Sequence, residues 1–340
     1  MSKGFGQLNL ILQNRPLYGG VLMNDLDISN LSRRNFIALA TTAFAALAFA
    51  PRFVFAESKG IVPTMRDAAA KATITTHPLR RNISVLEGSG GNIAVLTGKD
   101  GKLLVDSGFT VSKARIVEAL KRLSPDPIAQ LLNTHWHTDH TDGNAWVHDA
   151  GARITAHLNT KKHLSTSTRV QGWEWTFPPA PSGAIPTVVF GDDHHLQHDN
   201  TNIRLKYYGP AHTDSDVSVV FEEADIIHVG DTWWNGIYPF IDYSTGGSID
   251  GMIQAAEQNL RAITDKMTVI PGHGPIGKKA GLVEFRDMLV TIRNNVATLK
   301  KQGKSLSETI AAKPTERYDA KYGQFLITPA FFTTLVYSGV

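Results

Sequence analysis

The residues best suited to chemistry in this chain are grouped in one short segment, residues 135–140, which reads HWHTDH. Imidazole nitrogens and carboxylate oxygens are ligands that Zn²⁺ accepts. Four such side chains are too closely spaced along the chain to surround one ion, so the spacing favours two adjacent metal ions. These candidate ligands are His135, His137, Asp139 and His140. The apolar run at residues 128–132 predicts a buried strand whose end delivers the motif into a loop.

Three residues further along the chain repeat this pattern singly. His212, Asp231 and His273 each stand at or just after the end of a short apolar run of β character. Taken one at a time they are weak signals, because most histidines and aspartates in proteins are not metal ligands. Together they provide the three ligands that two adjacent ions still lack. The sequence therefore predicts a dinuclear metal site.

The HxHxDH segment, followed by His, Asp and His in that order, resembles the metallo-β-lactamase-fold (dizinc) hydrolase superfamily over about residues 80–300. The resemblance implies two Zn²⁺ ions per chain. It assigns three histidines to the first ion: His135, His137 and His212. It assigns three residues to the second ion: Asp139, His140 and His273. Asp231 would bridge the two ions.

The same resemblance gives a supporting role to Asp106. Residues 103–106 are expected to form a strand that ends in Asp-x-Gly, and in this family the carboxylate usually supports the ligand loop from behind the ligands. From the residues alone, a turn residue before Gly108 is an equally good interpretation. The chain departs from many family members at Asp142-Gly143, where they have Gly-Gly. We expect this difference to alter the loop and not the metal ligands.

Strands and helices alternate along the chain without internal repeats. Strands are predicted at residues 83–86, 93–97, 103–106, 152–156, 188–190, 203–208, 217–221 and 226–229. Helices are predicted at residues 112–123, 249–263 and 280–302, with a further helix starting near 160–164. This order fits the α/β (α+β) class and the four-layer αββα sandwich that the resemblance implies. The tail at residues 305–340 is expected to add a helix and a packed segment to the same domain.

Residues 1–56 are predicted to be a leader that does not belong to the fold. Arg33-Arg34 resembles a twin-arginine export signal, and an Ala-rich apolar run (residues 36–50) and a small-residue exit (residues 54–56) follow it. The run is shorter than the ~20 residues that span a bilayer, which favours a removable signal over a membrane anchor. The sequence therefore predicts export by the twin-arginine machinery and a periplasmic domain at residues 57–340. Met23 is an alternative start.

The charge balance gives no support for nucleic-acid binding. The leader holds five basic and two acidic residues, so 29 of the 34 basic and 29 of the 31 acidic residues remain in residues 57–340. The net charge of +3 therefore belongs to the leader. The chain has no cysteine, which excludes disulfides, thiolate ligands and iron–sulfur clusters.

The predicted chemistry is hydrolysis of a small ester, lactone or related carbonyl substrate. A water between two Zn²⁺ ions has its pKa lowered towards ~7, which provides a metal-bridging hydroxide at neutral pH. Asp139 would orient this hydroxide and carry its proton to the leaving group. Aromatic-rich loops suggest the substrate pocket, and Asn235 or Tyr238 could donate to an oxyanion. The pocket candidates are Trp175, Trp234, Asn235 and Tyr238.

Two alternatives stay open. A metallo-β-lactamase that opens a β-lactam amide is the second enzyme hypothesis, although Asp231 stands where one lactamase subclass has cysteine and another has serine. A non-catalytic exported metal-binding accessory protein is the alternative from another class. His194, His195 and His198 are interpreted as a solvated turn and are left out of the metal site.

Export can be tested directly. Replacing Arg33 and Arg34 together by lysine should leave unprocessed precursor in the cytoplasm, because the export receptor reads the arginine pair. Fractionation with N-terminal sequencing of the mature form gives the measurement. Normal processing of the double variant to a periplasmic form that starts near Glu57 would refute the twin-arginine assignment.

Overall fold

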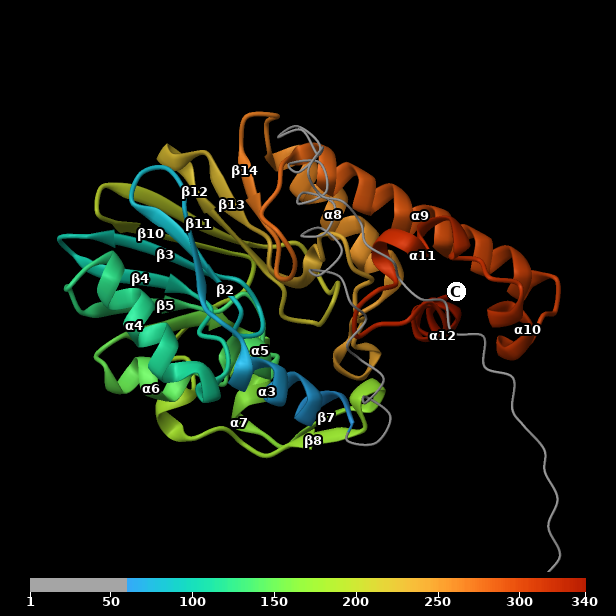
Figure 1. Cartoon of the computed structure of the whole chain (residues 1–340), viewed down its shortest axis with the longest axis horizontal. Helices are drawn as coiled ribbons and strands as arrows, with labels where there is room; N and C mark the ends of the chain where they lie inside the picture. The colour runs from blue at the N-terminus through green and yellow to red at the C-terminus, as the bar shows by residue number, and fades with distance from the viewer. Residues whose placement is uncertain (1–59) are drawn as a thin grey trace, which may run out of the picture. The chain divides into compact units, whose positions relative to one another are not determined.

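Two β-sheets form the centre of the fold (Figure 1). The computed structural model describes residues 60–340, and the predicted leader lies outside the described residues. In the first sheet, β1 to β4 form an antiparallel meander, and β4, β5, β6 and β9 run parallel. Its strands are β1 (Thr75–Pro78), β2 (Ile83–Glu87), β3 (Ile93–Gly98), β4 (Gly101–Val105), β5 (Ile128–Leu132), β6 (Arg153–His157) and β9 (Val188–Phe190).

The second sheet has five strands in the order in which they occur in the chain. Neighbouring strands are antiparallel except for the last pair, which is parallel. The strands are β10 (Asp193–His198), β11 (Thr201–Tyr207), β12 (Val217–Phe221), β13 (Ile226–His228) and β14 (Thr268–Ile270). A separate hairpin joins β7 (Thr168–Val170) to β8 (Trp175–Phe177).

Apolar side chains from both sheets meet in one buried cluster. Val85 and Leu103 come from the first sheet, and Leu205 and Val219 come from the second. Leu104, next to Leu103 in β4, belongs to a different cluster, because successive side chains of a strand point to opposite faces of its sheet. The first sheet therefore has two buried faces, which explains its almost continuous apolar strands.

Helices cover the outer face of each sheet. The first sheet packs on Ile116 and Leu120 of α4 and on Val147 of α6. The second packs on α8 and α9 through side chains that include Met252 and Phe285. These helices are α4 (Lys113–Leu123), α6 (Asn144–Asp149), α8 (Ile249–Ala262) and α9 (Lys279–Lys301). The four layers confirm the αββα sandwich predicted from the sequence.

The C-terminal tail forms more helix than its sequence pattern predicted. It contains three helices instead of one: α10 (Leu306–Ala311), α11 (Glu316–Tyr322) and α12 (Pro329–Gly339). Tyr322 of α11 and Phe332 of α12 belong to the same buried cluster as Met252 and Phe285. The tail thus extends the outer helical layer over the second sheet.

Several local predictions differ from the structure. His194, His195 and His198 lie in the edge strand β10, so the prediction of a solvated turn was wrong. Residues 168–177, predicted as part of a long loop, form the β7–β8 hairpin. The remaining helices are α3 (Ile61–Lys71), α5 (Thr138–Thr141) and α7 (Leu158–Ser165). The 3₁₀ turns are η2 (Thr110–Ser112), η3 (Gln171–Trp173), η4 (Ser182–Ala184), η5 (Glu222–Ala224), η6 (Gly230–Thr232) and η7 (Tyr243–Thr245). Within residues 60–340, no helix has both the length and the apolar character needed to cross a bilayer.

Candidate metal centre

The seven predicted ligands come together at one edge of the sandwich. They form three groups whose ligand atoms lie within 4.8 Å of one another. The groups are His135, His137 and His212; His135, His140 and Asp231; and Asp139, His140 and His273. Each ligand follows the carboxyl end of a strand. The HxHxDH segment follows β5, His212 follows β11, Asp231 follows β13 and His273 follows β14. Ligands from these strand ends are far apart in the sequence and adjacent in space.

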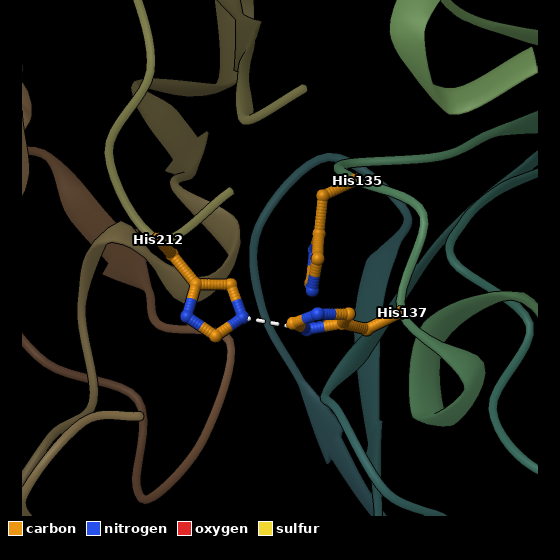
Figure 2. Close-up of side chains that lie close together, drawn as sticks. All are labelled: His135, His137 and His212. Atoms are coloured by element: carbon orange, nitrogen blue, oxygen red, sulfur yellow. Dashed lines mark hydrogen bonds between the residues drawn. The ribbon is translucent and has the colours of Figure 1, made fainter. Parts of the chain in front are cut away.

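The three histidines of the first group point toward a common centre (Figure 2). His137 Nδ1 lies 2.8 Å from His212 Nε2. The opposite nitrogens of both rings donate elsewhere, His137 Nε2 to Asp242 Oδ2 at 3.1 Å and His212 Nδ1 to the Phe240 carbonyl at 2.7 Å. In the neutral rings the two facing nitrogens therefore both carry lone pairs. A cation bound by these nitrogens would stabilise this arrangement.

His135 gives a second sign that the site is built for a metal. Its ring is buried, and Nε2 has no hydrogen-bond partner among the described residues. Its Nδ1 lies 3.1 Å from Thr134 Oγ1, to which it can donate. A buried nitrogen without a partner costs free energy, because it has lost its hydrogen bonds to water. A metal ion bound at Nε2 would remove this cost, so the residues present fit a metal centre.

Asp231 faces the ligands assigned to the first ion and those assigned to the second. Its Oδ2 lies 3.3 Å from His212 Nε2 and 3.8 Å from His135 Nε2. Its Oδ1 lies 3.1 Å from His140 Nε2. The carboxylate is 2% exposed, so imidazoles and not water surround it. This position between the two groups is the one that a bridging ligand requires.

Asp106 lies behind the ligands and is completely buried. It accepts hydrogen bonds from the Thr134 backbone at 2.8 Å, from Thr134 Oγ1 at 2.7 Å and from His140 Nδ1 at 2.8 Å. Its backbone has φ 66, a conformation that a residue other than glycine seldom adopts. These contacts fix the His140 ring and, through Thr134, the His135 ring. They are what the predicted supporting role requires, and the alternative of a turn residue before Gly108 does not explain them.

The buried charges shift one another's pKa values. Burial alone would raise the pKa of Asp139, but His140 and His273 lower it to about 2. Burial lowers the pKa of His135 well below its usual value, which keeps the ring neutral and able to bind a metal. Asp231, Asp139 and Asp106 raise the pKa of His140 well above its usual value, against the effect of burial. The carboxylates thus favour positive charge in this place.

Two glycines allow the ligand loops to pack so closely. A Cβ at Gly272 would lie 1.9 Å from Asp231 Oδ1, and one at Gly91 would lie 2.1 Å from His140 Cε1. Real Cβ atoms do not approach other atoms so closely. Any side chain at either position would therefore displace a candidate ligand.

Two of the predicted substrate residues, Tyr238 and Asn235, differ in how their polar groups are engaged. Tyr238 is 1% exposed, and its hydroxyl donates to Asp319 Oδ1 at 2.8 Å. Asn235 Nδ2 donates to the Pro275 carbonyl at 2.6 Å. The single donor of Tyr238 is engaged within the protein and is not available for an oxyanion, which corrects that interpretation for Tyr238. Asn235 Nδ2 has a second N–H beside the one that Pro275 accepts. Burial in a protein core, the competing explanation for these residues, holds for Tyr238.

The two tryptophans predicted to line the substrate pocket lie in different surroundings. Trp234 is 4% exposed, and its ring centre lies 4.2 Å from that of His273 and 6.0 Å from that of His212. It packs against two candidate ligands instead of lining an open mouth. Trp175 is half-buried in β8, with its ring 6.4 Å from Phe177.

Sequence reasoning missed several residues that hold the ligands. Asp242 accepts a hydrogen bond from His137, and the Phe240 carbonyl accepts one from His212. The centre of the Trp173 ring lies 4.6 Å from that of the His137 ring. None has a fixed spacing from the HxHxDH segment. The weak signal that could have found Asp242 is its place between the apolar Phe240-Ile241 and a short polar turn, where a buried carboxylate needs a partner.

A cavity of about 410 Å³ adjoins the ligand loop. Trp136, Thr138 and Thr141 line it from the HxHxDH segment and the residue after it. Phe177 lines it from the end of β8, and Pro178 lines it from just beyond that strand. The Trp136 ring also lies 4.8 Å from the His137 ring. The same tryptophan therefore contacts both the cavity and a candidate ligand.

Comparison with known proteins decides the family. The family model of the metallo-beta-lactamase superfamily matches residues 86–273, a range that contains all seven candidate ligands. The chain belongs to the metallo-beta-lactamase superfamily. Members of this superfamily are metal-dependent hydrolases, and so is this protein.

Individual relatives are distant. The chain is 23% identical over 226 residues to a metallo-beta-lactamase type 2 of Bacillus sp. (strain 170), which covers 64% of this chain and 82% of the relative. The crystal structure of DIM-1 metallo-beta-lactamase has 23% identity and a TM-score of 0.51 over 64% of this chain and 97% of that one. The sec-alkylsulfatase Pisa1 from Pseudomonas sp. has 14% identity and a TM-score of 0.60 over 83% of this chain. The match covers 53% of the sulfatase, so this chain spans about half its length. These structures share the fold with this chain.

Metal content tests the ligand assignment. The protein should bind about two zinc-class ions per chain, the number that seven ligands can hold. His135→Ala and His212→Ala should deplete the first site, and His273→Ala should deplete mainly the second. Elemental analysis of the purified variants gives the measurement. A parent protein with one iron and no zinc would contradict the assignment.

The close approach at Gly272 gives an independent test. Gly272→Ala should reduce zinc content and lower the thermal midpoint of the metal-loaded protein, because its Cβ displaces Asp231. Gly191→Ala is the matched control, since its Cβ would meet only Leu158 at 3.9 Å, an ordinary contact. Equal zinc content in the two variants would show that Asp231 does not need its present position.

Proposed function

We propose that this protein is a dinuclear zinc hydrolase that cleaves a small ester, lactone or related carbonyl substrate. The observation that carries the proposal is the position of Asp231, whose carboxylate lies within 3.4 Å of imidazole nitrogens from both groups of ligands. These are His212 of the first group and His140 and His273 of the second. A site for one ion would not need a carboxylate shared in this way. Two zinc ions bound there would supply a water of lowered pKa and an electrophile for the substrate carbonyl.

The residues of the chain would divide the work between holding metals and moving a proton. The first ion would be held by His135, His137 and His212, and the second by Asp139, His140 and His273, with Asp231 between them. Asp139 Oδ2 lies 3.1 Å from His273 Nε2 and 3.6 Å from His140 Nε2. Asp139 is the group we assign to accept the proton of the attacking water and to deliver it to the leaving group.

The cavity beside Trp136 supports a small organic substrate. Its volume of about 410 Å³ falls within the range of roughly 300–1,000 Å³ that is typical of small-molecule sites. Phe177 and the prolines that follow it provide an apolar wall, and Thr138 provides a hydroxyl. We propose that the cavity takes the apolar part of the substrate while the scissile carbonyl lies at the metals.

β-Lactam hydrolysis is the second candidate, and one observation favours it. The Bacillus relative, whose match covers 64% of this chain, is a metallo-beta-lactamase. Asp231 weighs against this function, because one lactamase subclass has cysteine at this position and another has serine. The alkylsulfatase shares the fold alone at 14% identity, and sulfate esters therefore enter only as members of the substrate panel.

The site of action is also a proposal. The twin-arginine pattern and the short apolar run lie at residues 1–56, outside the described residues. We propose that the enzyme is exported by this route and acts in the periplasm on a diffusible small molecule.

Asp139→Asn tests the mechanism. The amide keeps the size of the side chain and one oxygen donor but cannot accept the proton, so turnover should fall by roughly 10²–10⁴. The rate should be measured with the best substrate from a panel of lactones, aryl esters, thioesters, β-lactams and alkyl sulfates. Asp149→Asn, the same change at an exposed position of α6, is the control.

The outcomes separate the alternatives. Parent-like turnover by a fully metal-loaded Asp139→Asn variant would refute the proton-transfer role. Preference for β-lactams would establish the second candidate. Hydrolysis of no panel member by the metal-loaded parent would favour the non-catalytic metal-binding protein.

A further inference from the structure

Residues 233–242 form an irregular segment between η6, which contains Asp231, and η7. Three of its groups contact candidate ligands. The Trp234 ring lies 4.2 Å from the His273 ring, the Phe240 carbonyl accepts from His212 Nδ1 at 2.7 Å, and Asp242 accepts from His137 Nε2 at 3.1 Å. One short segment therefore orients ligands of both metal groups, although it has no helix or strand of its own to make it rigid.

The middle of this segment is attached to the C-terminal helix α11 through Tyr238. The Tyr238 backbone N–H donates to the Tyr322 carbonyl at 2.8 Å. Its hydroxyl donates to Asp319 Oδ1 at 2.8 Å and lies 3.3 Å from the Thr315 carbonyl. Its ring stacks on that of Phe332 with 4.6 Å between centres. The tail thus contacts Tyr238 at three places: its backbone N–H, its hydroxyl and its ring.

The attachment point is close in sequence to the groups that hold the ligands. Phe240 is two residues from Tyr238, and Trp234 and Asp242 are each four residues away. Metal sites tolerate little displacement of the groups that orient their ligands, so a change in the path of this segment alters metal binding. The tail lies beyond residue 273, where the superfamily match ends.

We propose that Tyr238 and Asp319 are positioning residues, through which the C-terminal helices hold residues 233–242 and thereby set the geometry of the first metal site. Tyr238 touches neither substrate nor metal in this scheme. The inference rests on the proposed metal centre and is independent of the proposed substrate.

Zinc affinity of the full-length protein provides the test. Dissociation constants should be measured by competition with a chromophoric chelator, in a His273→Ala background so that the first site is observed. Tyr238→Phe removes the hydroxyl and should raise the first-site constant by about tenfold, the lower end of the effect of changing groups that orient ligands. Asp319→Ala should act similarly, and Asp319→Asn, which keeps an oxygen acceptor, should restore affinity close to that of the parent.

Co²⁺ absorption gives a second readout that loss of stability alone would not change. Tyr238→Phe should alter the ligand-field bands of the cobalt-loaded protein. Tyr337→Phe is the matched control, because it removes a tail hydroxyl that donates to the Lys304 carbonyl at 2.9 Å, away from residues 233–242. It should leave the bands and the zinc constant unchanged, whatever its effect on the thermal midpoint.

Failure of the inference is distinct from failure of the proposed function. If the parent binds no zinc, the metal centre itself is refuted. If the parent binds two zinc ions and Tyr238→Phe keeps the parent's constant and cobalt spectrum, the tail has only a structural role. Equal effects of Tyr238→Phe and Tyr337→Phe on zinc affinity would also overturn the proposal.

Discussion

The structure depends on the burial of one carboxylate among imidazoles. Asp231 is 2% exposed, and four histidine rings have nitrogens within 3.8 Å of its oxygens. Removing so many polar groups from water is costly unless each has a partner. Several ring nitrogens face other lone pairs instead of donors, and His135 Nε2 has no partner in the described part of the chain. Bound cations would offset this cost, so metal binding would also stabilise the ligand loops.

The sandwich solves the positional part of that problem. The strand ends from which the ligand loops start are held in place, because the strands are buried between the sheets and under the helices. Asp106 at the end of β4 then fixes Thr134 and His140 with three hydrogen bonds. Glycines at positions 91 and 272 let the loops approach the ligands as closely as the site needs. Rigid strands set the approximate position of each ligand, and hydrogen bonds to the rings set its orientation.

The tail adds a support that lies outside the part of the chain shared with the superfamily model. Residues 233–242 contact ligands of both metal groups, and they also pack on the helical layer to which the tail contributes. A function that varies within one fold is expected to reside in such loops and additions and not in the sheets. Tyr238, placed in the substrate pocket by its sequence context, belongs to this support.

The sequence by itself determined the order of the main elements and the sandwich, and it predicted the seven candidate ligands that the structure brings together. Clustered histidines and apolar runs are local signals, and burial between two sheets imposes the alternation that makes strands recognisable. It did not determine which groups hold the ligands or which aromatics are buried. Asp242, the Phe240 carbonyl and Asp319 carry no local pattern, because their partners are distant in the chain. β10 was mistaken for a turn because it is a polar edge strand, in which every second position is exposed. These features were decided only by tertiary structure, since a hydrogen bond between distant residues exists only after the sheets and helices have packed.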